Sequence, residues 1–143
     1  MRLADVNVLV TAFRDDAPGH KVCRGLVEDM VAGPLPYGVS DLVLSGFLRV
    51  STHTRVFDPP SPVEEALAFA DAYRGGAGAV PVEPGPRHWA IFASLCRTAL
   101  AKGNLIPDAY LAALALESGC EWVTADRDFG RFPNLRWTLV DLH

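Results

Sequence analysis

The chain has 143 residues, of which 50% are apolar and 21% are charged, and its formal net charge is −4. This length is typical of one domain with a sizeable core, so we expect a single domain over residues 1–143. The negative charge argues against a protein that holds nucleic acid by overall attraction, although a local basic rim remains compatible with it.

The sequence lacks the marks of a membrane or secreted protein. Its apolar runs are broken by Gly, Pro or charge well before the ~20 residues that a membrane span needs, and we find no pattern of a signal peptide. The three cysteines include no C-x-x-C pair, which argues against a disulfide framework and a four-thiolate zinc site. We therefore expect a reduced, cytoplasmic protein that makes no membrane contact.

The first half of the chain alternates short apolar runs with helical patterns. Apolar and β-branched residues around Asp5 and Asn7 predict a short buried strand, and Ser61 is placed to cap a later helix. In order, the predicted elements are a strand at 3–10, a helix at 21–31, a strand at 37–39, a helix at 41–50 and a helix from Ser61 to about residue 73.

The second half continues this alternation. The predicted elements are a strand at 79–82, a helix around 92–99, a helix from Pro107 to about Glu117, and strands at 121–124 and 137–140. The glycines at 75, 76 and 78 do not predict a phosphate-binding loop, because they follow a helix and precede a strand. The whole pattern predicts an α/β domain with a mostly parallel, helix-covered sheet.

Three aspartates fall where such a fold places its chemistry. We expect Asp5 at the end of the first strand and Asp126 after the fourth, and ligands of open α/β sheets bind beyond the carboxyl ends of the strands. Asp108 lies in the first turn of a helix, where an acid also stabilises the helix dipole by roughly 0.3–1 kcal/mol. Because that helix is apolar on several faces, we expect Asp108 to be at least partly buried. Clustered carboxylates without His or Cys favour a hard ion, Mg²⁺ or Mn²⁺, which can activate water.

Three segments together resemble the PIN-domain ribonucleases and, more narrowly, the VapC toxins of bacterial toxin–antitoxin pairs. They are A-D-V-N at 4–7, P-D-A-Y-L-A-A-L-A at 107–115 and V-T-A-D-R-D-F at 123–129. The resemblance implies a three-layer α/β/α fold with a central four- or five-stranded sheet. It also implies an endoribonuclease that needs Mg²⁺, or Mn²⁺ in its place, and cleaves structured RNA such as tRNA or rRNA. A small VapB-like antitoxin would silence it, and a homodimer is common in the family.

The resemblance also assigns roles to individual residues. Asp5, Asp108 and Asp126 match the acids that bind the metal and carry out catalysis. Asp128 is a nearby alternative to Asp126, and we favour Asp126 because it lies nearer the strand end, where sheet pairing holds the backbone. Asn7 matches a residue that supports the first acid by hydrogen bonding. The chain departs from the family at Gly46, where many members carry a glutamate. This departure leaves the fourth carboxylate open and could weaken the metal site or abolish activity.

Four arginines are candidates for RNA contacts around the acids, because phosphate is commonly bound by arginine side chains. They are Arg49, Arg55, Arg127 and Arg131. The histidines are scattered without helix or hairpin spacing, so we interpret them as ordinary surface or structural residues and not as metal-free acid–base groups.

Two other functions remain open at this point. Gly46 makes a weakly active or inactive module that binds RNA or antitoxin a reasonable alternative. A phosphatase dependent on Mg²⁺ and acting on a small molecule is the other. In such an enzyme the nucleophilic aspartate is usually followed two residues later by a second aspartate, and this chain has Asn7 there.

Overall fold

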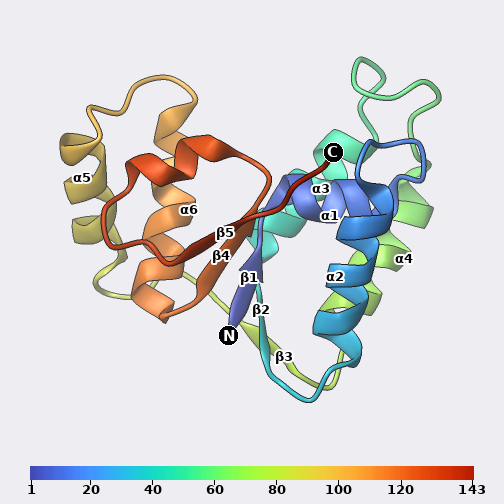
Figure 1. Cartoon of the computed structure of the whole chain (residues 1–143), viewed down its shortest axis with the longest axis horizontal. Coiled ribbons are helices and arrows are strands. Elements are labelled where there is room, and N and C mark those ends of the chain that lie inside the picture. The colour runs from blue at the N-terminus through green and yellow to red at the C-terminus, as the bar shows by residue number, and fades with distance from the viewer.

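Five short parallel strands form the centre of the molecule in the computed structural model, which describes residues 1–143 (Figure 1). Their order across the sheet is β3-β2-β1-β4-β5, and each neighbouring pair is parallel. The strands are β1 (Arg2–Ala4), β2 (Tyr37–Val39), β3 (Ala79–Pro81), β4 (Glu121–Thr124) and β5 (Trp137–Leu139). The prediction of a parallel sheet with four or five strands is confirmed.

Six α-helices cover the two faces of this sheet (Figure 1). On one face lie α1 (Val6–Phe13), α2 (His20–Ala32), α3 (Asp41–Ser51) and α4 (Val63–Arg74), and on the other lie α5 (His88–Thr98) and α6 (Leu105–Ser118). The chain first moves outward from β1 to β3 and then returns to β4, so right-handed crossovers place the two sets of helices on opposite faces. None of the helices is both long and apolar enough to cross a membrane.

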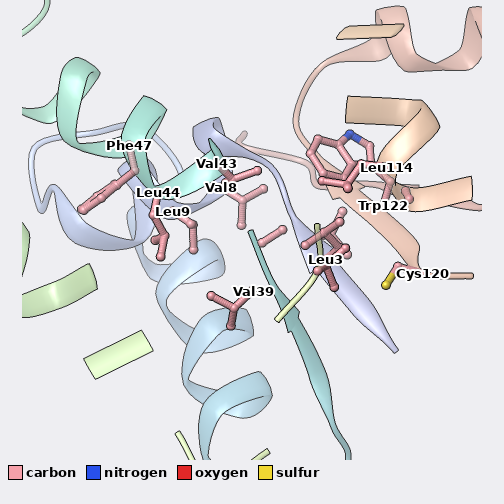
Figure 2. Packing of buried hydrophobic residues seen from close by; sticks show 14 of the residues in the cluster. Leu3, Val8, Leu9, Val39, Val43, Leu44, Phe47, Leu114, Cys120 and Trp122 are labelled. Atoms are coloured by element: carbon pink, nitrogen blue, oxygen red, sulfur yellow. The ribbon is translucent and has the colours of Figure 1, made fainter. Parts of the chain in front are cut away.

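The core lies on both faces of the sheet, which explains why the buried positions of β1, β2 and β4 are mostly apolar. Figure 2 shows Leu9, Val43 and Phe47 packed together between α1 and α3, while Trp122 of β4 lies near Leu114 of α6 on the other side. All five side chains are nearly inaccessible to solvent. Helices on both faces therefore hold the carboxyl edge of the sheet in place.

Two predicted details of the elements are wrong. The strand predicted over residues 3–10 ends at Ala4, and Val6 already begins α1. Asp5 causes the change, because its side chain accepts a hydrogen bond from the Val6 amide and so caps the helix. Ser61 does not cap α4, which begins after Pro62 without a side-chain cap, and its hydroxyl instead accepts a hydrogen bond from Arg14.

Candidate active site

Asp5 lies at the carboxyl end of β1, which is the central strand of the sheet. Strand order reverses between β1 and β4, and this is the position at which open α/β sheets bind ligands. The Asp5 side chain is buried and accepts hydrogen bonds from the Val6 amide (2.7 Å), the Thr124 hydroxyl (2.6 Å) and the Asn7 amide (3.2 Å). Burial nevertheless raises the pKa of Asp5 to about 6, because desolvation outweighs these hydrogen bonds.

Thr124 and Asn7 join the end of β1 to the segment that follows β4. The Thr124 hydroxyl donates to Asp5 and accepts a hydrogen bond from the Asp126 amide at 3.0 Å. Asn7 accepts a hydrogen bond from the Ala125 amide at 3.1 Å while its own amide donates to Asp5. The hydrogen bond from Asn7 that the resemblance implies is therefore present. Thr124 was missed in the sequence, although its position two residues before Asp126 could have indicated it.

Asp108 and Asp126 approach Asp5 from two other elements. Asp108 lies in the first turn of α6 and is half-buried, as expected, while Asp126 precedes the short 3-10 helix η1 (Arg127–Arg131). The pKa of Asp108 is raised to about 6, first by burial and then by the negative charges of Asp126, Asp5 and Asp128. The pKa of Asp5 is also raised by the charge of Asp126. The three predicted acids therefore lie near enough for their negative charges to repel, although they do not form a closed group around an ion.

Asp128 is in a different position. It is exposed, and its carboxylate lies 3.9 Å from the Arg131 guanidinium in an ion pair. Its amide donates to Asp126, so Asp126 and not Asp128 caps η1. Asp128 influences the pKa of Asp108 but not detectably that of Asp5. These contacts favour Asp126 over Asp128 as the third acid of the cluster.

The four candidate RNA-binding arginines are all exposed, but they differ in their partners. Arg131 pairs with Asp128, while Arg49, Arg55 and Arg127 form no ion pair with any carboxylate of the chain. Three of the histidines form hydrogen bonds within the chain, and His53 accepts one from the Arg55 amide through Nδ1 at 3.0 Å. The Nε2 atom of buried His88 donates to the Tyr110 carbonyl at 3.0 Å, and Nδ1 of His20 lies 2.9 Å from the Thr11 carbonyl.

Gly46 lies against the start of α1. A Cβ atom at this position would be 2.8 Å from the Cγ2 atom of Val6, the residue that follows Asp5. A glutamate here would therefore require Val6 to move. Gly46 thus packs against the residue that follows Asp5, and the space that a side chain would need is occupied by Val6.

The three acids have the oxygen ligands that a hard divalent ion prefers, but their side chains are not placed around a common point. Asp5, Asp108 and Asp126 offer only oxygen atoms, and none of them forms an ion pair. As the side chains stand, no group of three or more His, Cys, Asp or Glu residues is close enough to hold an ion together. Burial, together with the negative charge of neighbouring acids, raises the pKa of Asp5 and of Asp108, and a bound cation would favour the ionised form of both.

Comparison with known proteins identifies the family of the chain. The family model described as "PIN domain" matches residues 2–135. The chain is 44% identical to Ribonuclease VapC25 of Mycobacterium tuberculosis over 136 residues, covering 95% of this chain and 96% of that protein. It is 45% identical to Ribonuclease VapC43 of the same species over 137 residues, covering 96% and 93%.

Among solved structures, the chain resembles one from the crystal structure of VapBC2 of Rickettsia felis bound to a DNA fragment from its promoter. The TM-score is 0.66 and the sequence identity is 19%, with 96% of this chain and 97% of that chain covered. This likeness confirms the three-layer α/β fold. On the family match and the identity to curated ribonucleases, the chain belongs to the PIN-domain family and, within it, to the VapC ribonucleases.

Proposed function

We propose that this ribonuclease is an endonuclease that depends on Mg²⁺, with Mn²⁺ able to replace it, and that it cleaves structured RNA such as tRNA or rRNA. The observation that supports this most strongly is that Asp5, Asp108 and Asp126, three acids without ion pairs, lie near enough for their charges to repel at the edge where strand order reverses. A bound ion would neutralise these acids and lower the pKa of a water molecule at the site.

The residues of the chain would hold and orient this site. Thr124 and Asn7 keep the Asp5 carboxylate directed toward the edge of the sheet, and the amide of Asp126 is held by Thr124. Asp108 and Asp126 would supply further oxygens. Because Mg²⁺ retains several waters in proteins, an ion bound partly through water is compatible with acids that do not form a closed cage.

The test is cleavage of bacterial total RNA with Mg²⁺, with Mn²⁺ and with excess EDTA, followed by sequencing of the RNA ends. We expect cleavage only with the divalent ions, and products that carry a 5′-phosphate and a 3′-hydroxyl, because water and not the ribose 2′-hydroxyl attacks phosphorus. Cleavage that persists in EDTA, or 2′,3′-cyclic phosphate ends, would contradict the proposal.

A second candidate function is a module that binds RNA or an antitoxin without cutting. Gly46 and the lack of three acids arranged around an ion favour it. RNA binding by the wild type, measured by fluorescence anisotropy, combined with no cleavage at millimolar Mg²⁺ would support this candidate against the first. Turnover of a generic phosphate ester without RNA cleavage would instead point to a small-molecule phosphatase.

We further propose that a small VapB-like antitoxin silences the protein and that the free protein is a homodimer. The antitoxin is suggested by the VapBC2 structure, one chain of which shares this fold. Its chain would place an Arg or Lys beside Asp5 and Asp108, since acids without ion pairs accept a guanidinium when metal is scarce. A complex in which the antitoxin blocks cleavage without approaching these acids would contradict this mode. Light scattering of the free protein tests the homodimer.

A further inference from the structure

A groove of about 510 Å³ opens beside the acid cluster, between α3 and the pair of helices α5 and α6. It is lined by eleven residues, seven of them hydrophobic. Two of these residues place the groove next to the site. Val6 directly follows Asp5, and Pro107 directly precedes Asp108. The groove is therefore adjacent to two of the three proposed catalytic acids.

The lining has the character of a site for a flat apolar group with a negative charge attached. Phe92 and Tyr110 contribute aromatic rings whose centroids lie 5.4 Å apart. Arg49 is the one charged residue of the lining, it is exposed, and no carboxylate of the chain pairs with it. No acid lines this groove, although the chain as a whole carries a net charge of −4.

Gly46 keeps the groove free of negative charge. It belongs to the lining together with Val6, and any side chain at position 46 would start from a Cβ atom that contacts Val6 at 2.8 Å. The wall nearest to Asp5 is thus made by the methyl groups of Val6 and by backbone. A carboxylate at this position would repel a phosphate, whereas glycine leaves the apolar surface continuous up to the acids.

We propose that this groove binds one unstacked nucleobase of the RNA strand, next to the phosphate that is cut, and that Arg49 contacts a neighbouring phosphate. The proposal rests on the proposed ribonuclease function. Bases removed from a helical stack commonly pack on aromatic side chains, and arginine provides two parallel donors to phosphate. The base would lie against Tyr110 and Phe92, with Leu42 at the open side of the groove, where it is 52% exposed.

The test measures kcat/KM on a fluorescent RNA hairpin that spans the cleavage site mapped with the wild-type protein. A second set of hairpins carries a single abasic residue at each position flanking the cut. The variants Tyr110→Leu and Leu42→Asn alter the groove, and Arg49→Gln removes its charge. The controls are Leu35→Asn, an exposed leucine before β2 outside the groove, and Arg97→Gln, an arginine of α5 that neither lines the groove nor forms an ion pair.

We expect one abasic position to lower kcat/KM of the wild type about tenfold, since a stacked base contributes this much or more. Tyr110→Leu should cause a similar loss on the intact hairpin but little further loss on that abasic hairpin, because both changes remove the same contact. Leu42→Asn, which changes an exposed residue and so keeps the fold, should show a smaller loss with the same pattern. Arg49→Gln should lower kcat/KM about tenfold, and the two control variants should match the wild type.

Three results would overturn the base site. If the wild type cleaves RNA but the groove variants match their controls, the base site is wrong and the ribonuclease proposal stands. If the wild type cleaves no RNA, both proposals fail together. If Leu42→Asn or Arg49→Gln changes the mass of the free protein in light scattering while kcat/KM is unchanged, the groove serves contact between copies of this chain instead.

Discussion

At the scale of single residues, the site is dominated by the competition between burial and hydrogen bonding at Asp5. Three donors reach its carboxylate, and each would by itself lower the pKa. The pKa nevertheless rises to about 6, because burial is the largest cause and Asp126 adds a negative charge. Asp108 shows the same direction without any hydrogen-bonded partner to compensate. The metal-free protein therefore holds its acids at an energetic cost.

This cost predicts how the stability of the metal-free protein depends on pH. The pKa values of Asp5 and Asp108 are about 6 in the folded chain and 3.8 without the fold, so the folded state binds protons more tightly. Stability should rise as pH falls from 7.5 through 6 to about 4, by roughly 2 kcal/mol between pH 7.5 and 5. Urea unfolding in EDTA at several pH values measures this, and added Mg²⁺ should raise stability most at pH 7.5. A stability that falls over this range would contradict the assignment.

Substitution of Asp108 should separate stability from activity. Asp108→Asn removes one of the repelling charges and breaks no hydrogen bond of the structure, so the metal-free protein should gain about 1 kcal/mol at pH 7.5, a figure reduced for solvent screening. RNA cleavage should be lost. Thermal unfolding and the cleavage assay measure the two effects, with Asp71→Asn on the exposed side of α4 as the control. Retained cleavage would remove Asp108 from the site.

Thr124 is predicted to position Asp5 through its hydroxyl group. Thr124→Val keeps the shape but removes the 2.6 Å hydrogen bond to Asp5 and the acceptor of the Asp126 amide. We expect about 1–2 kcal/mol lower stability and an activity profile shifted to higher pH, because the Asp5 carboxylate loses a donor that lowers its pKa. Thr124→Ser should restore both, and Thr138→Val, at an exposed hydroxyl, serves as the control. A profile that does not move would leave Thr124 with a packing role.

At the scale of secondary-structure elements, the important event is the change from β1 to α1 at Asp5. One residue ends the strand, caps the helix and presents an acid at the sheet edge. The helix that follows carries Val6 into contact with Gly46 of α3. The absence of a side chain at Gly46 is thus matched to the close approach of these two helices.

This contact can be tested with a pair of substitutions. Gly46→Ala in a helix would by itself add about 1 kcal/mol, but its Cβ would lie 2.8 Å from Val6, whose β-branched side chain has little freedom to turn. We expect a net loss of about 1 kcal/mol in the wild type and a gain once Val6→Ala is also present. Chemical unfolding of the four proteins completes the cycle. Equal effects of Gly46→Ala in both backgrounds would show that Val6 is not the obstacle.

At the scale of the whole molecule, the topology collects groups that are distant in the sequence. Because β1 and β4 are neighbours at the reversal of strand order, Asp126 lies near enough to Asp5 to act on its charge. The two residues are 121 positions apart in the sequence. The helix α6 returns to the same edge and brings Asp108. The molecule thus carries concentrated negative charge at the edge, with exposed arginines on α3, on the loop after it and on η1.

The small number of these arginines predicts a weak dependence of RNA binding on salt. If Arg49, Arg55, Arg127 and Arg131 all contact phosphates, the slope of log K against log salt concentration should be about −3 on single-stranded RNA, at roughly −0.7 per contact. Arg127→Gln should make it shallower by about 0.7. Anisotropy titrations at fixed Mg²⁺ measure the slope. A slope much steeper than −3 would indicate phosphate contacts that these arginines do not account for.

The sequence by itself determined the class of fold and the identity of the acids. Periodicity located the four strands β2 to β5 and most helices to within a residue or two, as at β2 and β4. The order and spacing of the three segments that contain Asp5, Asp108 and Asp126 indicated the family, because both can be read directly from the sequence. The strand predicted over residues 3–10 failed since an apolar run has the same composition in a buried strand and in a buried helix.

Only the tertiary structure decided which groups act on one another. The bond from Thr124 to Asp5 joins residues 119 positions apart, and the ion pair of Asp128 with Arg131 adds to the preference for Asp126 that the strand end already suggested. The same holds for the contact between Gly46 and Val6 and for the groove that they share with Tyr110. Desolvation, close packing and long-range electrostatics depend on distances in space, and these distances are set by how the helices cover the sheet, which no local pattern contains.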